Sequence, residues 1–425
     1  MTRELSVYLD GTRAGTLRQT RQGNTTFRYE DAYGASHRAT PTPVSLSMPV
    51  SRREHPARVV IPFLQGLLPD SPTKLAQLAR DYQTSPRNAF GLLAHVGRDS
   101  AGAIQVLSPG EDSTDAATRQ GDVTPLTNAK VGEVIADLIE HSDTWGRGRA
   151  DMHWSLPGAQ PKVALFRFDD GSWGTPNDST PTTHILKPAV APYTDHDVNE
   201  HVTLGAARIL GLTVSQHELM TTDQGHRVFV STRYDRRKVG GRWVRLHQED
   251  LCQALSVAPD MKYQQDGGPG VNQIAGLFDN LSDARDQADS RRRFFDALVF
   301  NVSAACTDAH AKNFSMLLSG RRATLAPPYD VGTHAPYPAA EPLRSAMKVD
   351  DEYTIDAIGL PELLKAATKL RIRADVAADR VAHIRTNMAA AFADAATATT
   401  GPGVRGYAAT VANSVHALAA ARGWS

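Results

Sequence analysis

The stretch TDAHAKNFSMLL, Thr307–Leu318, places an aspartate, a histidine, a lysine and an asparagine within six residues, and an apolar run follows at once. The residues after Asn313 have the composition of a buried strand, so these polar groups directly precede a strand. Solvated loops are polar, but they rarely bring carboxylate, imidazole, ammonium and amide groups together beside a buried strand. The stretch therefore predicts a loop that carries metal or proton-transfer chemistry.

Asp308 and Asn313 are five residues apart, which is the D-x-x-x-x-N spacing of the catalytic loop in protein kinases. In that loop the aspartate orients the substrate hydroxyl and accepts its proton. The asparagine amide oxygen is a hard, neutral ligand for Mg²⁺. The spacing alone is a weak signal, because Asp and Asn are also common turn and cap residues.

A second acidic residue follows two strand-like runs that are joined by a Gly-Arg-Arg turn. Asp330 stands just past the second run, in the sequence Tyr329-Asp330-Val331-Gly332. A kinase places its second acidic Mg²⁺ ligand on the strand pair that follows the catalytic loop. One aspartate and one asparagine suffice, because Mg²⁺ completes its shell with phosphate oxygens and water.

Residues before this region are candidates for binding nucleotide phosphates. The loop Ser155–Lys162 contains a glycine and leads into an apolar strand, so its backbone amides can cradle phosphates. It matches neither G-x-x-x-x-G-K-[ST] nor G-x-G-x-x-G. Lys187 lies at the end of the next predicted strand, where a lysine can reach the α and β phosphates. Glu200, on the following predicted helix, either braces this lysine or is an ordinary solvated residue.

The composition excludes several classes of protein. Lys plus Arg and Asp plus Glu number 46 each among 425 residues, which argues against a broad polyanion-binding surface. Two cysteines, Cys252 and Cys306, make neither a disulfide framework nor a zinc–cysteine cluster, and they fit a reducing compartment. No apolar run reaches the ~18 residues needed to span a bilayer, and the N-terminus has no signal-peptide core. We therefore expect a cytoplasmic protein without a membrane partner.

The periodicity predicts an α+β chain in which a β-rich piece, a mixed α/β lobe and a helical lobe follow one another. Residues 1–108 form a small β-rich N-terminal subdomain, with a hairpin at Asp10-Gly11 and two helices that each start at Ser-Pro. Residues 109–125 are a polar linker. Residues 126–246 form a mixed α/β nucleotide-binding lobe. Residues 247–425 form a helical catalytic lobe, with a β-like pair at 313–327 and a helix break near 399–406.

Ten ordered blocks give most of the chain a resemblance to a known family. The blocks are LLPDSP (67–72), GRDSAGAIQVL (97–107), SLPGAQPKVAL (155–165), TTHILKP (182–188), NE (199–200), RYDR (233–236), LHQEDLCQAL (246–255), KYQQDGGPG (262–270), TDAHAKNFSMLL (307–318) and LAPPYDV (325–331). Together they resemble the HipA-like kinases, the toxin halves of bacterial toxin–antitoxin modules. The resemblance implies an α+β, protein-kinase-like two-lobed fold and a serine/threonine protein kinase that uses ATP and Mg²⁺.

The resemblance implies a role for each matching residue. Asp308 is expected to be the catalytic aspartate, and Asn313 and Asp330 the metal ligands. The residues expected to bind ATP are Ser155, Leu156, Pro157, Gly158, Ala159, Gln160, Lys162, Lys187, Tyr234, Gln248 and His310. Ser155 falls on the autophosphorylated serine of the family, and Tyr234 ends a strand, 230–234, that edges the adenine pocket. Two departures stand out: Ala305-Cys306 where the family has Gly-Asn, and Pro157 in place of a small residue.

The resemblance also implies partners. A translation component, such as an aminoacyl-tRNA synthetase, is the expected protein substrate, and its phosphorylation is expected to arrest growth. A small helix-turn-helix antitoxin is expected to bind the kinase and DNA together, and the zero net charge agrees with DNA contact residing mainly in that antitoxin. Two alternatives stay open, namely a small-molecule kinase of related fold and a nucleotide-binding regulator without turnover. The intact set of Asp308, Asn313 and Asp330 argues against the second.

Overall fold

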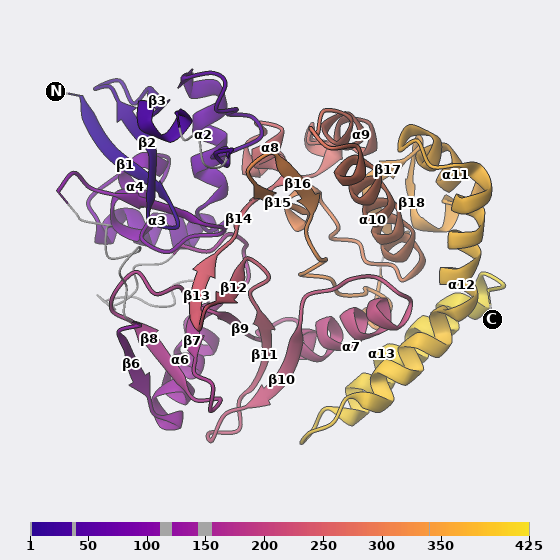
Figure 1. Ribbon diagram of the computed structural model, residues 1–425. Coiled ribbons are helices and arrows are strands. Elements are labelled where there is room, and N and C mark those ends of the chain that lie inside the picture. The colour runs from indigo at the N-terminus through magenta and orange to yellow at the C-terminus, as the bar shows by residue number, and fades with distance from the viewer. Residues whose placement is uncertain (1, 36–39, 111–120, 143–154, 340, 425) are drawn as a thin grey trace. The chain divides into compact units, whose positions relative to one another are not determined.

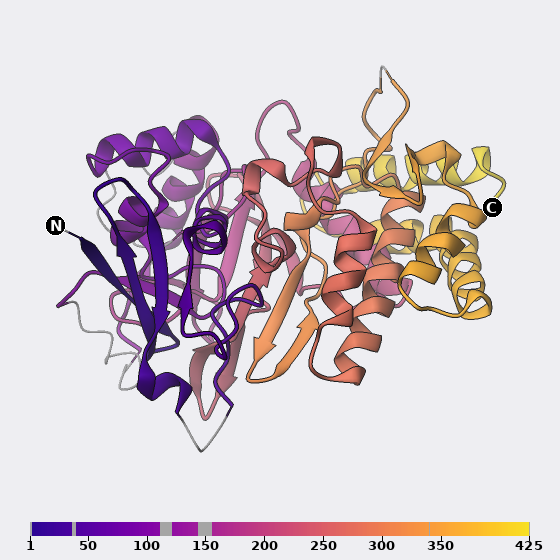
Figure 2. The same cartoon turned by 90° about the horizontal axis from the view of Figure 1, so that it is seen from above.

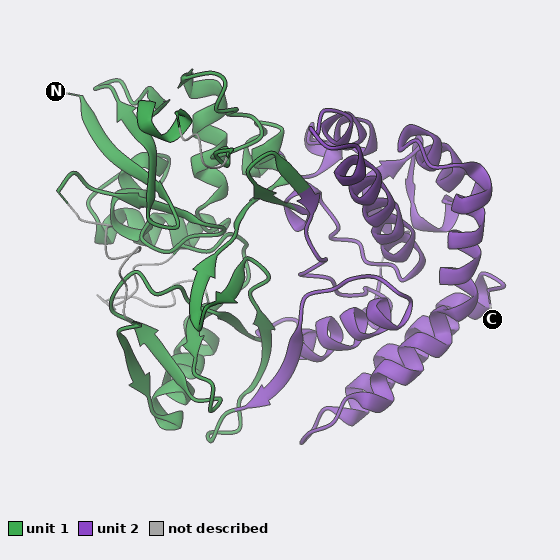
Figure 3. Ribbon diagram, in the orientation of Figure 1, with its two compact units in different colours: residues 1–188, 222–260, 316–323 green, residues 189–221, 261–315, 324–425 purple. Residues whose placement is uncertain are grey.

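The computed structural model describes residues 2–35, 40–110, 121–142, 155–339 and 341–424. The chain divides into two compact units (Figure 3): unit 1 is residues 1–188, 222–260 and 316–323, and unit 2 is residues 189–221, 261–315 and 324–425. Both units combine helices with strands, which confirms the predicted α+β class. Within the described ranges, no helix has the length and apolar character needed to cross a membrane.

Unit 1 begins with an antiparallel sheet in the strand order β4-β3-β2-β1-β5 (Figure 1). The strands are β1 (Arg3–Leu9), β2 (Thr12–Gln19), β3 (Thr25–Tyr29), β4 (Glu54–His55) and β5 (Ile104–Leu107). Asp10 and Gly11 both have positive φ, 42° and 80°, as the turn of a tight hairpin requires. The predicted hairpin is therefore confirmed. Alternate residues of β1 are buried, so this face of the sheet forms the core of the N-terminal part.

Four helices accompany this sheet: α1 (Asp31–Gly34), α2 (Ala57–Gly66), α3 (Pro72–Asp81) and α4 (Ala89–Val96). Helix α3 starts as predicted, because the Ser71 side chain accepts a hydrogen bond from the Lys74 N–H (3.2 Å) and Pro72 takes the first helical position. The predicted start of α4 at Ser85 is wrong. Its cap is Asn88, whose side chain accepts from the Gly91 N–H (3.1 Å) and so satisfies one of the free donors of the first turn.

The second sheet of unit 1 contains the strands in the order β11-β9-β7-β8-β6, with helix α6 (Asn128–Glu140) before β7 in the sequence. The strands are β6 (Val123–Leu126), β7 (Val163–Arg167), β8 (Trp173–Pro176), β9 (His184–Pro188) and β11 (Arg227–Thr232). The predicted linker falls partly at residues 111–120, outside the described residues. Its last three residues belong to β6, which pairs antiparallel with β8.

The rest of unit 1 consists of short elements. These are β12 (Arg236–Val239), β13 (Arg242–Arg245), β14 (His247–Asp250), α8 (Leu251–Ala254), β15 (Ser315–Ser319) and β16 (Arg322–Leu325). Strand β16 ends just inside unit 2. Residues 247–250 form β14. Asp250 then caps α8, accepting from the Gln253 N–H (2.8 Å) in a capping box. The β-like pair predicted at 313–327 is confirmed as β15 and β16.

Unit 2 is mainly helical, and its helices α9–α13 gather together in both views (Figures 1 and 2). Its elements are α7 (His196–Ile209), β10 (His217–Thr221), α9 (Val271–Asp279), α10 (Ala284–Ser303), β17 (Arg344–Val349), β18 (Glu352–Thr354), α11 (Leu360–Lys369), α12 (Ala374–Ala398) and α13 (Arg405–Ala421). The 3₁₀ turns are η1 (Pro259–Met261), which crosses the unit boundary, η2 (Gln264–Asp266), η3 (Ala311–Asn313) and η4 (Ile355–Ala357).

Helix α12 packs against α7, α10, α11 and α13, and so it forms the centre of this helical layer. The rings of Phe300 on α10 and Phe392 on α12 stack with centroids 6.2 Å apart. The predicted break between α12 and α13 is confirmed. The antiparallel pair β17–β18 was not predicted, and a further break separates α11 from α12.

Candidate active site

The predicted catalytic loop follows the long, largely buried helix α10. The chain leaves the helix through Ala305, whose φ of +55° lies in the left-handed region that commonly ends helices and favours glycine. The Cys306 N–H then donates to the Asn301 carbonyl oxygen (2.8 Å). This conformation gives a physical reason for the glycine that the related family has in place of Ala305. Burial raises the pKa of the Cys306 thiol, so it stays protonated and unreactive.

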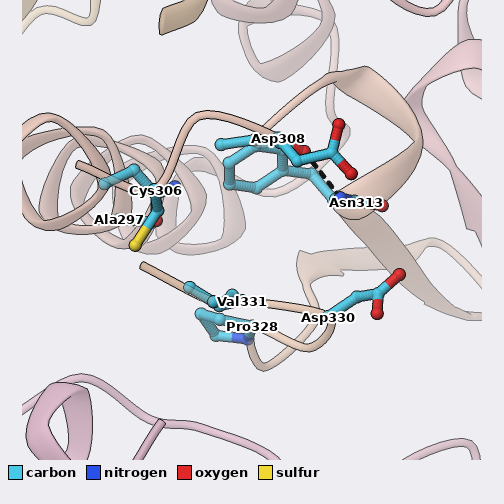
Figure 4. A pocket seen from close by; sticks show the side chains of 11 residues that line it. Ala297, Cys306, Asp308, Asn313, Pro328, Asp330 and Val331 are labelled. Atoms are coloured by element: carbon cyan, nitrogen blue, oxygen red, sulfur yellow. Dashed lines mark hydrogen bonds between the residues drawn. The ribbon is translucent and has the colours of Figure 1, made fainter. Parts of the chain in front are cut away.

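Asp308, Asn313 and Asp330 line one pocket in unit 2, with a volume of about 330 Å³ that includes space open to solvent. Figure 4 shows their three side chains along the same side of the pocket, with Cys306 at the opposite end. The Asn313 amide nitrogen donates to the Asp308 main-chain oxygen (2.7 Å). This hydrogen bond orients the amide, so that its oxygen can serve as a ligand. The structure thus brings together the three residues that were predicted to carry the chemistry.

The oxygen atoms of this pocket are of the hard type that Mg²⁺ prefers. Among the described residues, no three His, Cys, Asp or Glu side chains gather into a protein cage for a metal ion. An ion at Asn313 and Asp330 would therefore need further oxygens from nucleotide phosphates and water, which is how kinases bind Mg²⁺. The residues present fit such an ion.

The segment that carries Asp330 is anchored to two helices through Thr333. The Thr333 N–H donates to Asn199 Oδ1 (2.9 Å), and Asn199 Nδ2 donates back to the Thr333 carbonyl oxygen (2.8 Å). The Thr333 hydroxyl donates to the carbonyl oxygen of Ala304, at the end of α10 (2.5 Å). Asn199 is fully buried on α7. Asn199 falls in the family block NE, but the sequence assigns it no role, because its partner lies far away in the sequence.

His310 lies beside the Asp308 carboxylate. Its side chain is only 3% exposed, against 65% for Asp308, and its Nε2 is 3.8 Å from Asp308 Oδ1. Tyr263 donates its hydroxyl to the same carboxylate oxygen. The Tyr263 ring meets the His310 ring edge-on, with centroids 4.9 Å apart. Tyr263 falls in the family block 262–270, and no local signal in the sequence marks it as a neighbour of Asp308.

The predicted phosphate-binding loop, Ser155–Lys162, lies in unit 1. Gly158 has a φ of +105°, which L side chains rarely adopt. The Lys162 ammonium is nearly buried and donates to the Pro157 carbonyl oxygen (2.7 Å), so it closes the loop on itself. The Gln160 side chain reaches the Pro188 carbonyl oxygen (3.4 Å) at the end of β9. The glycine and the lysine therefore fix the loop conformation together.

Ser155 is held at both its main chain and its side chain. Its N–H donates to the Asp99 carbonyl oxygen (2.9 Å), and its hydroxyl donates to the Leu67 carbonyl oxygen (2.6 Å). The residue is buried. In this conformation the hydroxyl is therefore engaged within unit 1.

Lys187 lies on β9 directly opposite Phe229 of β11. Its ammonium is 5.6 Å from the centroid of the Phe229 ring, a cation–π distance. The side chain is nearly buried, so the strand pair orients it. Glu200 is buried on α7 in unit 2, whereas Lys187 belongs to unit 1. Their pairing stays a prediction.

Tyr234 and Gln248 are in contact within unit 1. The Tyr234 hydroxyl donates to Gln248 Oε1 (2.7 Å). The predicted strand end at Tyr234 is wrong, because β11 ends at Thr232 and Tyr234 belongs to the turn before β12. Gln248 lies on strand β14. The structure thus joins two of the residues that were predicted to bind ATP.

A buried ionic cluster lies next to Ser155 and Tyr234. Asp99 accepts hydrogen bonds from Arg236 (2.9 Å) and Arg245 (3.0 Å), and Asp235 accepts from Arg233 (2.8 Å). All five side chains are largely buried. The family blocks that contain Asp99 and Arg236 thus meet in the folded chain, which their distance in the sequence does not reveal. This cluster anchors Asp99, whose carbonyl oxygen accepts the hydrogen bond from the Ser155 N–H.

Comparisons with known proteins identify the family of this chain. Residues 5–107 match the HipA N-terminal domain, and residues 154–396 match the HipA-like C-terminal domain, which spans more than half of the chain. A Sinorhizobium fredii protein named "Putative kinase Y4mE" is 33% identical over 413 residues, which are 93% of this chain and 94% of that protein. The "Serine/threonine-protein kinase toxin HipA" of Shewanella oneidensis is 28% identical over 73% of this chain and 74% of its own length.

A solved structure agrees on the fold. It is described as the Shewanella oneidensis toxin–antitoxin system of HipA, HipB and its operator DNA, and it matches with a TM-score of 0.82 at 23% identity. The match covers 98% of this chain and 96% of that one. Because models of both HipA domains match and a relative is 33% identical over 93% of the chain, this chain belongs to the HipA family of serine/threonine protein kinases.

Proposed function

We propose that this protein is an ATP- and Mg²⁺-dependent serine/threonine protein kinase that acts as the toxin of a toxin–antitoxin module. The observation that carries the proposal is the pocket of unit 2, in which Asp308, Asn313 and Asp330 share one side. These are the three side chains that phosphoryl transfer requires from a catalytic loop and its following strand pair.

The proposed reaction transfers the γ-phosphoryl group of ATP to a serine or threonine hydroxyl. Asp308 orients the hydroxyl and accepts its proton while the oxygen attacks phosphorus. A new oxygen–phosphorus bond forms, the bond to the β–γ bridging oxygen breaks, and ADP leaves. Asn313 and Asp330 would hold Mg²⁺, which neutralises charge on the phosphates when bound. We assign the loop Ser155–Lys162 and Lys187 to the ATP phosphates.

The remaining assignments concern the nucleotide base and the layout of the chain. Tyr234 and Gln248, which share a hydrogen bond, are assigned to the adenine side, and His310 to the catalytic loop. We assign ATP binding to the mixed lobe 126–246 and phosphoryl transfer to the lobe 247–425. The subdomain 1–108 and the linker 109–125 precede both.

Autophosphorylation at Ser155 would regulate this activity. The serine hydroxyl is bonded to the Leu67 carbonyl oxygen, so residue 155 must leave this position to meet a catalytic site. A phosphate there adds a charge of about −1.5 to −2 at neutral pH. Such a charge would repel the phosphates of ATP and stop their binding to the loop. We therefore expect the modified protein to be inactive.

The proposed partners follow from the family. The Shewanella structure holds a toxin with HipB and operator DNA, and for this chain we propose a helix-turn-helix antitoxin that makes most of the DNA contact. The proposed protein substrate is a translation component, such as an aminoacyl-tRNA synthetase. Its phosphorylation would arrest growth.

The test is an incubation of purified protein with cell lysate, ATP and Mg²⁺, followed by mass spectrometry of phosphorylated serine and threonine. The control is Asp308→Asn, which keeps the side-chain shape but removes the base. We expect transfer to fall at least ~10²-fold, with ATP binding preserved in calorimetry. Protein phosphorylation that is equal in both samples would remove Asp308 from the mechanism. ATP consumption with small alcohols but without protein phosphorylation would favour a small-molecule kinase.

A further inference from the structure

The contact between Tyr263 and Asp308 joins two parts of unit 2 that are far apart in the sequence. The tyrosine hydroxyl donates to Asp308 Oδ1. His310 approaches the same oxygen with its Nε2 at 3.8 Å, and its ring packs edge-on against the tyrosine ring. One carboxylate oxygen therefore faces two neighbours. Even with these two neighbours, 65% of the Asp308 side chain is exposed to solvent.

The backbone around Tyr263 fixes the position of this hydroxyl. The Tyr263 carbonyl oxygen accepts from the N–H of Asp266 (3.1 Å) and from the N–H of Gly268 (2.9 Å). A Cβ atom on Gly268 would lie 2.0 Å from the Met261 carbonyl oxygen and 2.7 Å from that of Tyr263, so only glycine fits there. Gly267 has a φ of +96°, another conformation that glycine favours. The two glycines thus make the tight turn that presents Tyr263.

A second hydrogen bond joins this turn to the proposed catalytic loop. The Lys262 carbonyl oxygen accepts from the Ala311 N–H (3.4 Å), three residues after Asp308. On the other side, the side-chain oxygen of Gln264 accepts from the Lys348 N–H of β17 (2.8 Å). Residues on both sides of Tyr263 are therefore anchored, and the tyrosine is well placed to orient a side chain on an exposed loop.

We propose that Tyr263 is a positioning residue for Asp308. Its hydroxyl engages Oδ1 and holds the carboxylate in one rotamer, so that Oδ2 is presented to the substrate hydroxyl and receives its proton. This proposal rests on the proposed function. Tyr263 does not touch the reacting atoms, and it acts only through Asp308. Loss of orientation at a reacting group can cost ~10²-fold in rate, so loss of this single hydrogen bond should lower kcat by about 10- to 100-fold.

The test compares steady-state phosphotransfer by the parent protein and Tyr263→Phe, which removes only the hydroxyl oxygen. We expect kcat to fall about 10- to 100-fold, while KM for ATP and the urea midpoint of unfolding stay at the parent values. Tyr353→Phe is the matched control, because Tyr353 lies in the same unit and stacks on Arg344 (4.8 Å) through its ring. This control should keep the parent kcat. A Tyr263→Phe protein with the parent kcat would overturn the proposal.

A double-mutant cycle shows whether the tyrosine acts through the carboxylate. Residual single-turnover transfer by Asp308→Asn should not fall further when Tyr263→Phe is added. If the second substitution lowered transfer in the Asp308→Asn protein as much as in the parent, Tyr263 would act by another route and the proposal would be wrong. If the parent protein itself transferred no phosphate, the proposed function would fail and this inference with it. Activity in the parent together with an unaffected Tyr263→Phe would reject the inference alone.

Discussion

Replacing Asp99 by asparagine should destabilise unit 1 strongly. The Asp99 carboxylate accepts from Arg236 at 2.9 Å and Arg245 at 3.0 Å, and it also accepts from the Thr182 hydroxyl at 2.8 Å. The guanidinium groups are 0% and 1% exposed, so they cannot be hydrated in place of the lost charge. Removing one partner from a buried ion pair costs about 3–5 kcal/mol. With an m-value of about 3 kcal/mol per M, the urea midpoint should fall by about 1–1.7 M.

The matched control is Asp169→Asn. Asp169 pairs with Lys238 at 2.8 Å, but its side chain is 84% exposed, and such surface pairs contribute at most about 1 kcal/mol. Urea unfolding followed by circular dichroism measures both variants. Because Ser155 is bonded to the Asp99 main chain, calorimetry should also show weaker ATP binding for Asp99→Asn. Equal, small shifts of the midpoint in the two variants would refute the reasoning.

The pH dependence of the free energy of unfolding provides a second test of the ionic cluster around Asp99. Burial alone would raise the pKa of Asp99, but the charges of Arg245, Arg236 and Arg233 hold it well below its ordinary value. A depressed folded-state pKa contributes stability above the unfolded-state value, about 3.9, that is lost as the pH falls through the folded-state value. The difference in urea midpoint between parent and Asp99→Asn should therefore be full at neutral pH and shrink in strong acid. A difference that stays constant with pH would argue against a charge effect.

Four other changes have separate outcomes. Asp330→Ala removes the proposed charged metal ligand, so ATP affinity in calorimetry should lose most of its dependence on Mg²⁺; an unchanged dependence would contradict the assignment. Asn199→Asp removes the amide that donates to the segment beyond Asp330, and it buries a charge. The urea midpoint should therefore fall by the equivalent of about 2–3 kcal/mol in the free energy of unfolding. A midpoint equal to that of the parent protein would show that this amide is dispensable. Burial raises the pKa of Glu249 from 4.5 to about 8, so the folded protein retains a proton that the unfolded chain has lost. Stability should then fall as the pH rises between these values, by up to about 1.4 kcal/mol per pH unit, and Glu249→Gln should flatten this slope in urea titrations. Gly158→Ala should lower the free energy of unfolding by about 1–2 kcal/mol because of the positive φ at this position, and it should weaken ATP binding in calorimetry. Gly225→Ala is the control, because Gly225 has a φ of +84° and no atoms lie within 4 Å of its Cβ position. This control should strain the chain but leave the affinity for ATP unchanged.

Local signals in the sequence were sufficient for many elements. The Asp10-Gly11 turn and the Ser71 cap of α3 depend on residues close together in the chain, and both were predicted correctly. The proposed catalytic loop could also be located from local residues, because Asp308 and Asn313 lie within one short segment. Short strands were harder to predict from the sequence. Residues 247–250 and the pair β17–β18 lack a clear alternation of apolar and polar residues, and their strand conformation depends on neighbouring segments.

The α+β class, the main helices, the order of the family blocks and the residues predicted to perform the chemistry could all be predicted from the sequence alone. Three contacts became visible only in the folded chain: Tyr263 with Asp308, Asn199 with Thr333, and Asp99 with Arg236 of another block. The physical reason is the range of the interactions. Turn, cap and periodicity preferences act between near neighbours in the chain, whereas a buried polar group must find its hydrogen-bond or charge partner wherever the folded chain places it.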